Sequence, residues 1–249
     1  MIKIYENIEM LSAAAAELFT TLADEAVQDH GSFTVALSGG KTPESAYRLL
    51  AQKPYLSRIP WQQIHIFWSD ERCVLPDSPD SSERMARHAF LDSVPIPPQD
   101  IHPIRCQDSP AEAAINYETL LKQFFTGKPP AFDLILLGLG TDGHTASLFP
   151  NTDVLNEKKR WTAETYVPGQ AFHRVTFTAP LINSAKTIVF LVSGIEKSDI
   201  LQRVFEGPYD PWNLPAQLIR PITGSLIWLI DSDAASKLSD NYKSQFIPI

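Results

Sequence analysis

Five short, almost uninterrupted runs of apolar residues alternate along this chain with longer amphipathic segments, and this alternation constrains the fold more than any other feature. The runs cover residues 33–38, 64–69, 132–138, 187–192 and 225–230. Apolar runs of this length are typical of strands that are buried on both faces. Such strands, alternating with helices, indicate a parallel sheet that helices cover on both sides. The sequence therefore predicts an α/β fold with an open, mostly parallel sheet.

The segments between these runs have the period of amphipathic helices. Residues 9–28 place leucines and alanines on one broad stripe. Thr42 and Pro43 supply a cap residue and a first-turn proline for a helix over residues 43–50. Alternating apolar and polar residues at 174–178 predict an edge or antiparallel strand. Further helices are expected over residues 81–91, 110–125, 196–205 and 231–238.

Length and charge limit the class of protein. A chain of 249 residues can bury an extensive core, and we expect one domain over residues 1–249, with residues 153–170 as a smaller appended element. The formal net charge of −8 argues against general binding to nucleic acid or to an anionic membrane. Because the whole protein repels anions, an anionic ligand has to be attracted by a few local cations and backbone N–H groups.

The two cysteines and the apolar runs bear on the compartment. Cys73 and Cys106 lack the spacing of a metal site, and we expect two reduced thiols rather than a disulfide. The longest aliphatic or aromatic runs have five residues, whereas a membrane span needs about 20. The first residues do not have the pattern of a signal peptide. We therefore expect a cytoplasmic protein.

A glycine-containing loop follows the first apolar run. The sequence Ser38-Gly39-Gly40-Lys41-Thr42 joins this run to the next predicted helix. Glycines allow backbone N–H groups to approach a ligand, and the positive end of the following helix points at the loop, so phosphate is a suitable ligand. The loop has neither a dinucleotide-binding motif nor a P-loop motif. A simple tight turn explains the loop equally well.

Three charged residues, Asp70, Glu71 and Arg72, follow the second apolar run. Ligands of open α/β sheets bind beyond such strand ends, and the planar guanidinium of Arg72 suits a phosphate or a carboxylate. Adjacent strand residues face opposite ways, so the two acids are not expected to act on one atom. Either acid could serve as a base or hold Arg72 in place. The alternative is a surface turn with a salt bridge.

The third apolar run leads into the sequence DGHTASLFP, which ends at Pro150. His144 is the best candidate for proton transfer, because an unperturbed imidazole titrates near neutrality. Asp142 could fix its tautomer through the other ring nitrogen. A lone histidine is more often structural, but the surrounding glycines and small polar residues at a strand end favour a functional one. Ser147 is a weaker candidate as a nucleophile, because GHTAS is not the GxSxG elbow.

Two further cations, Arg174 and Lys197, are each typical of solvated surface charges, although both could attract an anionic substrate. Taken together, these motifs resemble the 6-phosphogluconolactonases in order and spacing from about residue 38 to residue 231. Pro79-Asp-Ser81 and Gly207-Pro-Tyr-Asp210 belong to the same pattern. The DGHTASLFP stretch is its most specific part.

The resemblance implies a fold similar to those of glucosamine-6-phosphate deaminase and ribose-5-phosphate isomerase. It implies hydrolysis of 6-phospho-D-glucono-1,5-lactone to 6-phosphogluconate in the oxidative pentose phosphate pathway, without a metal or an organic cofactor. The partner is then a small sugar-phosphate lactone, and the chain is expected to be a monomer or a small homo-oligomer. The catalytic and phosphate-binding positions of the family map onto Ser38, Gly39, Gly40, Thr42, Arg72, His144, Arg174 and Lys197. We expect Asp142 to assist His144 as a catalytic residue.

Two other functions remain open. An amino-sugar-phosphate isomerase or deaminase also resembles this sequence, but that family carries a glutamate five residues after the histidine, where this chain has Phe149. Phenylalanine cannot transfer a proton, so this position favours the lactonase. A non-catalytic sugar-phosphate sensor would keep the anion-binding groups without needing His144, and no helix-turn-helix segment is evident.

Overall fold

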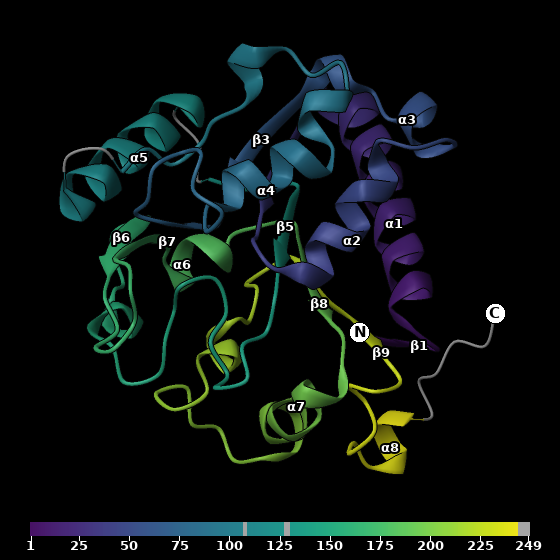
Figure 1. The fold of residues 1–249 in the computed structure, drawn as a ribbon, viewed down its shortest axis with the longest axis vertical. Helices are drawn as coiled ribbons and strands as arrows, with labels where there is room; N and C mark the ends of the chain where they lie inside the picture. Colours follow the sequence, from purple (N-terminus) through teal and green to yellow (C-terminus); the bar gives the residue numbers. More distant parts are fainter. Residues whose placement is uncertain (107–108, 127–129, 244–249) are drawn as a thin grey trace.

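The computed structural model describes residues 1–106, 109–126 and 130–243. Its main sheet has the strand order β1-β9-β8-β5-β2-β3, and every neighbouring pair is parallel (Figure 1). The strands are β1 (Ile2–Tyr5), β2 (Phe33–Leu37), β3 (Ile64–Trp68), β5 (Leu134–Leu137), β8 (Thr187–Val192) and β9 (Ser225–Asp231). The predicted α/β fold with a mostly parallel sheet is confirmed.

Helices connect the strands, and most lie where the amphipathic pattern predicts them. The α-helices are α1 (Ile8–His30), α2 (Lys41–Leu50), α3 (Tyr55–Arg58), α4 (Ser82–Ala89), α5 (Pro110–Phe124), α6 (Ala179–Ile182), α7 (Ser198–Glu206) and α8 (Asp240–Lys243). The short 3-10 helices are η1 (Trp61–Gln63), η2 (Leu91–Ser93), η3 (Pro98–Asp100), η4 (Asp153–Asn156), η5 (Ile195–Lys197) and η6 (Pro215–Leu218).

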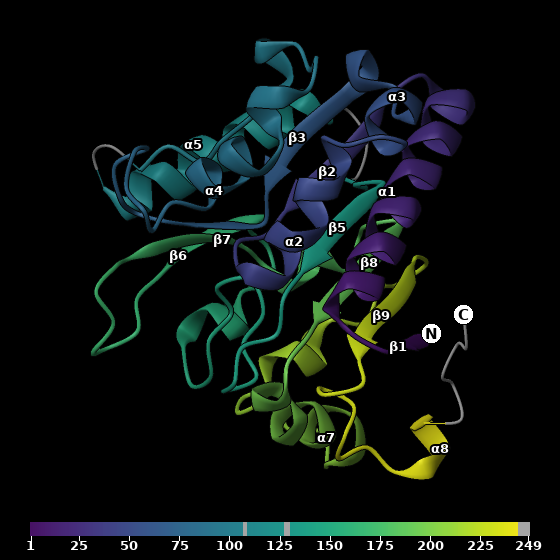
Figure 2. The same ribbon diagram turned by 45° about the vertical axis from the view of Figure 1, so that its right-hand side comes forward.

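Both faces of the main sheet are covered, as the aromatic contacts of β2 and β3 show. Phe33 in β2 packs against Phe19 in α1, with ring centroids 5.3 Å apart. Phe67 in β3 packs against Phe124 in α5, with centroids 5.1 Å apart. Phe67 is in register with Ala36, three residues after Phe33, and side chains alternate along a strand. The two contacts therefore lie on opposite faces, which is why both strands are almost entirely apolar (Figure 2).

A second, three-stranded antiparallel sheet lies beside the first and has the order β4-β7-β6. Its strands are β4 (Asp70–Arg72), β7 (Arg174–Phe177) and β6 (Thr162–Thr165). The antiparallel strand predicted at 174–178 is thus confirmed. Residues 153–170 contribute η4 and β6, and β6 packs against both β7 and α5. This stretch is therefore part of the second sheet.

The sequence pattern missed three strands and misplaced one helix. Strands β1, β4 and β6 have only three or four residues each, too few for a periodic pattern. The helix predicted over residues 231–238 is wrong. The chain forms hydrogen-bonded turns there: Asp231 caps a first turn through its carboxylate and its carbonyl, but the next bonds, from the N–H of Ser236 to Asp233 and from that of Leu238 to Ala235, span only three residues and do not continue an α-helix.

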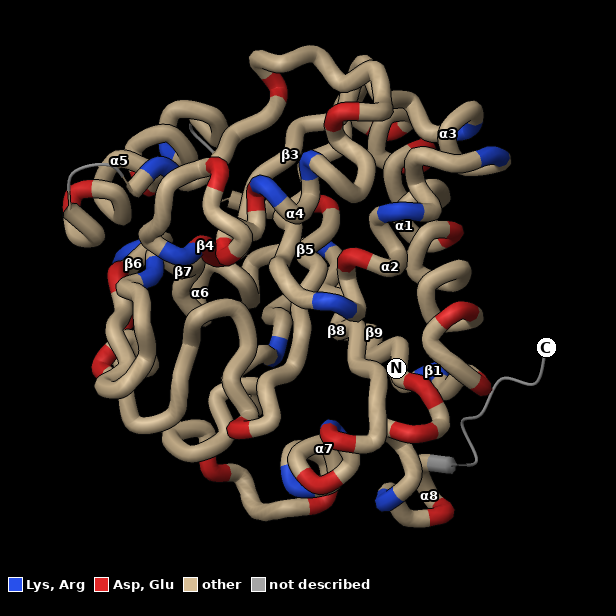
Figure 3. The backbone as a smooth tube through the Cα atoms, viewed as in Figure 1, with Lys and Arg blue, Asp and Glu red and all other residues tan. Residues whose placement is uncertain are grey.

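Four neighbouring strands of the main sheet, β8, β5, β2 and β3, end at the same edge. The loops that follow their carboxyl ends are therefore brought together, although they are far apart in the sequence. Lysine and arginine positions are interspersed with acidic ones along the whole backbone (Figure 3). Within the described part of the chain, no helix is both long and apolar enough to cross a membrane.

Candidate active site

The loops at this edge enclose a cavity of about 300 Å³. It lies beyond the carboxyl ends of the strands, where ligands of open α/β sheets bind. Seven of the nine site residues predicted from the sequence line it; Asp142 and Arg174 do not. Its polar and charged lining comprises Ser38, Gly39, Gly40, Lys41, Thr42, Asp70, Arg72, Ser82, Gly138, Gly140, His144, Ser193, Glu196 and Lys197.

The glycine-containing loop after β2 presents an open helix terminus to this cavity. Gly40 is the N-cap of α2 with a φ of 109°, and it provides no side-chain cap for the first turn. Such a backbone angle strongly favours glycine. The hydroxyl of Ser38 is buried and has no hydrogen-bond partner within the described chain. Uncapped N–H groups and an unpartnered hydroxyl facing one cavity suit an anionic ligand.

Tyr47 in α2 fixes the start of this loop. Its hydroxyl donates to the carbonyl of Ser38 and accepts from the N–H of the same residue, both at 3.1 Å. Burial raises the pKa of Tyr47 far above its usual range, so its hydroxyl stays protonated. Gly39 is required for a different reason, because a Cβ atom there would lie 2.5 Å from the hydroxyl of Ser82. The wall of the cavity thus depends on close packing between this loop and α4.

The loop after β5 holds the imidazole of His144 in one orientation. Nδ1 of His144 lies 2.5 Å from the Asp142 carboxylate, which also accepts from the backbone N–H of His144. Burial alone would raise the pKa of Asp142, but hydrogen bonds and charge attraction from His144 outweigh it and lower this pKa. Within the described chain, no hydrogen bond occupies Nε2. The ring therefore lines the cavity with one nitrogen fixed and the other available.

Packing around the imidazole explains two further residues of the DGHTASLFP stretch. A Cβ atom at Gly140 would lie 2.1 Å from Nδ1 of His144, so only glycine leaves room for the ring. The ring of Phe149 packs against the imidazole with centroids 4.2 Å apart. Ser147 is fully buried, and its hydroxyl donates to the Asp70 carboxylate at 2.6 Å. A hydroxyl that is buried and does not line the cavity does not fit a nucleophile.

Only two of the three cations predicted from the sequence line the cavity. Arg72 and Lys197 line the cavity. Arg174 does not line it; its guanidinium lies 4.9 Å from the centroid of the Phe149 ring. Burial and the nearby positive charge of Arg72 lower the pKa of Arg174, and the two arginines are directly opposite each other on β4 and β7. Like charges in this position repel unless an anion lies nearby.

Several residues of the site were missed from the sequence. Lys41, Ser82, Ser193 and Glu196 line the cavity, and each adjoins or lies close to a motif that the sequence singled out. Asp231 supports the loop after β8, where its carboxylate accepts from the Ser193 hydroxyl and from the Gly194 N–H. Among the ion pairs of the described residues, none includes Lys41, Arg72 or Lys197. These three cations are therefore not neutralised by a neighbouring carboxylate.

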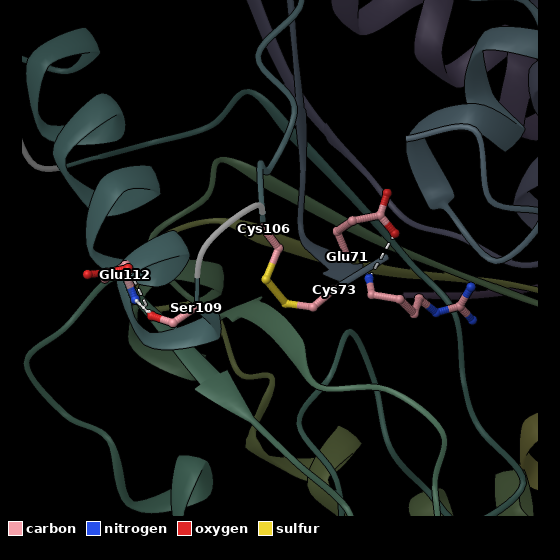
Figure 4. Close-up of a disulfide and its surroundings, with 6 residues drawn as sticks. Glu71, Cys73, Cys106, Ser109 and Glu112 are labelled. Carbon is pink, nitrogen blue, oxygen red and sulfur yellow. Dashed lines mark hydrogen bonds between the residues drawn. A yellow bond between two sulfur atoms is a disulfide. The ribbon is translucent and has the colours of Figure 1, made fainter. Parts of the chain in front are cut away.

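The two cysteines do not have the state expected from the sequence. Cys73 and Cys106 form a disulfide, with Cα atoms 5.1 Å apart (Figure 4). The expectation of two reduced thiols is therefore wrong. Spacing in the sequence could not show the pairing, because it depends on the strand bridge between Ile66 and Ile101, which brings the segment before α5 beside β3 and β4. The disulfide joins this segment to the residue after Arg72.

No group of three or more histidine, cysteine or acidic side chains within the described ranges is arranged to hold a metal ion. The fold and the cavity together define an α/β protein whose cavity brings a histidine, two of the predicted cations and the uncapped amino end of α2 together. The model of the glucosamine-6-phosphate isomerase/6-phosphogluconolactonase family matches residues 6–228. The chain belongs to this family.

Individual relatives agree with this assignment. The 6-phosphogluconolactonase of Synechocystis sp. is 46% identical over 236 residues, which cover 93% of this chain and 95% of the relative. The solved 6-phosphogluconolactonase of Trypanosoma cruzi has a TM-score of 0.83 at 25% identity, with 96% of each chain covered. A monomeric glucosamine-6-phosphate deaminase shares the fold, with a TM-score of 0.81 at 23% identity over 95% of this chain and 99% of that one. The predicted similarity to the deaminase fold is confirmed.

Proposed function

We propose that this protein hydrolyses 6-phospho-D-glucono-1,5-lactone to 6-phosphogluconate, the activity named for its relatives. The observation that carries the proposal is a single cavity that combines His144, with Nε2 available, and the uncapped amino end of α2. The first group activates water, and the second binds a phosphate. The substrate needs both, because it is a cyclic ester that carries a phosphate.

The chemistry follows from the groups in the cavity. Nε2 of His144 takes a proton from a water molecule, whose oxygen attacks the carbonyl carbon of the lactone. Asp142 accepts from Nδ1 and stabilises the imidazolium that forms. The carbon–oxygen bond of the ring then breaks, and His144 returns the proton to the ring oxygen. General-base catalysis typically contributes about 10²–10⁴-fold, and one donor to the oxyanion about 10²–10³-fold.

The phosphate is bound at the other side of the cavity. Backbone N–H groups of Gly39, Gly40 and Thr42, the hydroxyl of Ser38, and the side chains of Arg72 and Lys197 supply donors around the α2 terminus. Arg174, whose guanidinium packs on the ring of Phe149, adds positive charge from outside the cavity lining. The helix terminus alone contributes only about 0.3–1 kcal/mol, so the side chains are required to hold a doubly charged group in a protein of net negative charge.

Phe149 separates this proposal from the amino-sugar-phosphate isomerase or deaminase. Its ring is buried against the imidazole of His144 and carries no proton-transfer group. The presence of His144 with a fixed tautomer also separates the proposal from a sensor that only binds sugar phosphates. Hydrolysis needs one base and an oxyanion donor; His144 is the proposed base, and we expect a backbone N–H group of a glycine loop to be the donor.

A pH-stat assay with freshly prepared 6-phosphogluconolactone tests the proposal. We expect proton release well above the spontaneous rate, and no comparable acceleration for the unphosphorylated lactone. Equal acceleration for both lactones would remove the phosphate-binding role. No acceleration for either would refute the proposed function.

A further inference from the structure

Glu71 is a buried carboxylate that faces away from the reaction and yet holds together one wall of the cavity. Its side chain is 5% exposed and does not line the cavity. One carboxylate oxygen accepts from the backbone N–H groups of Arg72 and Ser82, both at 2.8 Å. The other accepts from the Glu83 N–H at 2.8 Å and from the Ser81 hydroxyl at 2.9 Å.

These four bonds close the loop of residues 73–81 between its two ends. Arg72 directly precedes the loop and Ser82 directly follows it, so one carboxylate ties β4 to the first turn of α4. A negative charge at the amino end of a helix is also favourable. The sequence left open whether Glu71 holds Arg72 in place. In the structure, the Glu71 carboxylate accepts from the backbone N–H of Arg72, whereas the guanidinium of Arg72 donates to the carbonyl of Asp80 at 2.7 Å.

Both residues tied by Glu71 lie in the cavity wall. Arg72 lines the cavity, and its guanidinium is held by the carbonyl of Asp80 within the closed loop. Ser82 lines the cavity too and is packed against Gly39 of the glycine-containing loop. If the bonds to Glu71 are lost and the two ends of the loop separate, the carbonyl of Asp80, which holds Arg72, and the side chain of Ser82, which supports the loop at Gly39, are both displaced.

We propose that Glu71 is a positioning residue for the phosphate-binding side of the site: it places Arg72 and Ser82 without contacting the substrate. The inference rests on the proposed function, because it assigns the phosphate to this side of the cavity. It predicts an effect on the binding of phosphorylated substrate and not on the chemical step, since Glu71 touches neither His144 nor Asp142.

The test is the variant Glu71→Gln, which keeps the size of the side chain but replaces one accepting oxygen with an NH₂ group. We expect KM for 6-phosphogluconolactone to rise about tenfold, the effect of losing one to two net hydrogen bonds, with kcat within about twofold of the wild type. Turnover of the unphosphorylated lactone should not change. Arg72→Ala sets the largest KM effect to be expected on this side of the site.

Glu83→Gln is the matched control, because it makes the same change in charge twelve residues further along, on α4. Glu83 is equally buried, but its carboxylate bonds to the side chains of Arg87 and Arg105. We expect this variant to unfold at a lower temperature with KM unchanged. A purely structural role for Glu71 would give the same result in Glu71→Gln, and that outcome would overturn the inference.

A second variant keeps the test decisive if Glu71→Gln does not fold. Glu71→Asp retains the charge but is shorter by one methylene, so it cannot keep all four bonds, and we expect a smaller rise in KM at unchanged kcat. An unchanged KM in folded Glu71→Asp would contradict the inference. If the wild type shows no lactone hydrolysis, the proposed function is refuted. If the wild type is active but the two Glu71 variants lose stability without a change in KM, as expected for Glu83→Gln, only the inference about Glu71 is refuted.

Discussion

The two edges of the main sheet use charged residues in opposite ways. At the carboxyl edge, Arg72 and Lys197 line a cavity, and within the described part of the chain neither has an ion-pair partner and the hydroxyl of Ser38 has no hydrogen-bond partner. At the amino edge, the buried carboxylate of Asp133 lies 2.9 Å from both His30 and Lys186. The same carboxylate accepts from the backbone N–H and the hydroxyl of Thr34.

This difference shows how one sheet provides both stability and function. Polar groups that are paired within the protein stabilise the fold, because burial without a partner costs free energy. Polar groups left unpaired at the carboxyl edge gain their partners only from a ligand. We therefore expect substitutions at the carboxyl edge to change catalysis more than stability, and substitutions at the amino edge to do the reverse.

The largest expected effect is that of His144→Ala at the carboxyl edge. We expect kcat to fall about 10²–10⁴-fold, the usual contribution of a general base. The free energy of unfolding should change little, because the imidazole is partly exposed and its main hydrogen bond is to the exposed Asp142. Steady-state kinetics and urea unfolding of the same preparation measure both. Wild-type turnover in this variant would remove His144 from the mechanism.

The disulfide is an exception at the carboxyl edge, because it should contribute to stability rather than catalysis. Cys73 and Cys106 are separated by 33 residues, and a crosslink that closes a loop of this length typically contributes about 2–4 kcal/mol to stability. We expect the double variant Cys73→Ser/Cys106→Ser to unfold at correspondingly lower urea concentration. A thiol titration of the unfolded wild type, with and without reductant, establishes that the bond is present. Identical unfolding of oxidised and reduced protein would show that the crosslink does not stabilise the fold.

Asp133→Asn tests the amino edge. The variant keeps the shape of the side chain, but it loses the charge that pairs with His30 and Lys186 and one acceptor for Thr34. Because the side chains of His30 and Lys186 are partly exposed, we expect a moderate loss of about 1–3 kcal/mol in the free energy of unfolding. KM and kcat should match the wild type at a temperature where both are folded. A change in KM as large as that in Arg72→Ala would mean that the two edges are not independent.

A smaller effect is expected from the pH dependence of stability, which involves neither edge cluster. Burial and the neighbouring His65 lower the pKa of His102 to about 4, and its ring packs on Phe67 with centroids 4.4 Å apart. An unfolded histidine titrates near 6.5. The folded state therefore binds this proton less readily, and stability should be complete above about pH 6.5 and fall as the pH approaches 4.

The expected loss between pH 7 and pH 5 is about 1–2 kcal/mol. Urea unfolding at the two pH values measures it, and His102→Gln is the control, because it should show a smaller loss over the same interval. If the wild type and His102→Gln lose equal stability, other groups cause the acid sensitivity.

Much of the fold was predictable from the sequence, because its signals are local. Long strands buried on both faces require continuous apolar residues, and α1 and α5 require an apolar stripe, so these elements follow from residue order alone. Short elements carry no such signal. Strand β4 consists of three charged residues, Asp70, Glu71 and Arg72, and it is a strand only because β7 offers it hydrogen-bond partners.

The same distinction applies to the site. The sequence singled out His144 with Asp142 and the loop at Ser38, because glycines and polar residues directly follow apolar strands. It could not show that the guanidinium of Arg174 packs on the ring of Phe149, outside the cavity lining, or that Glu71 closes a loop through backbone N–H groups. Those contacts join residues of different elements, and their distances depend on the strand order.

The sequence by itself determined which segments form the main strands and the longer helices, and which strand ends carry reactive side chains, because periodicity and residue chemistry are properties of neighbouring residues. Only the tertiary structure decided which of those ends share a cavity, which of its cations form no ion pair among the described residues and that Cys73 meets Cys106. These features arise when the sheet assembles in the order β1-β9-β8-β5-β2-β3, because hydrogen bonding between strands brings residues together that are far apart in the chain.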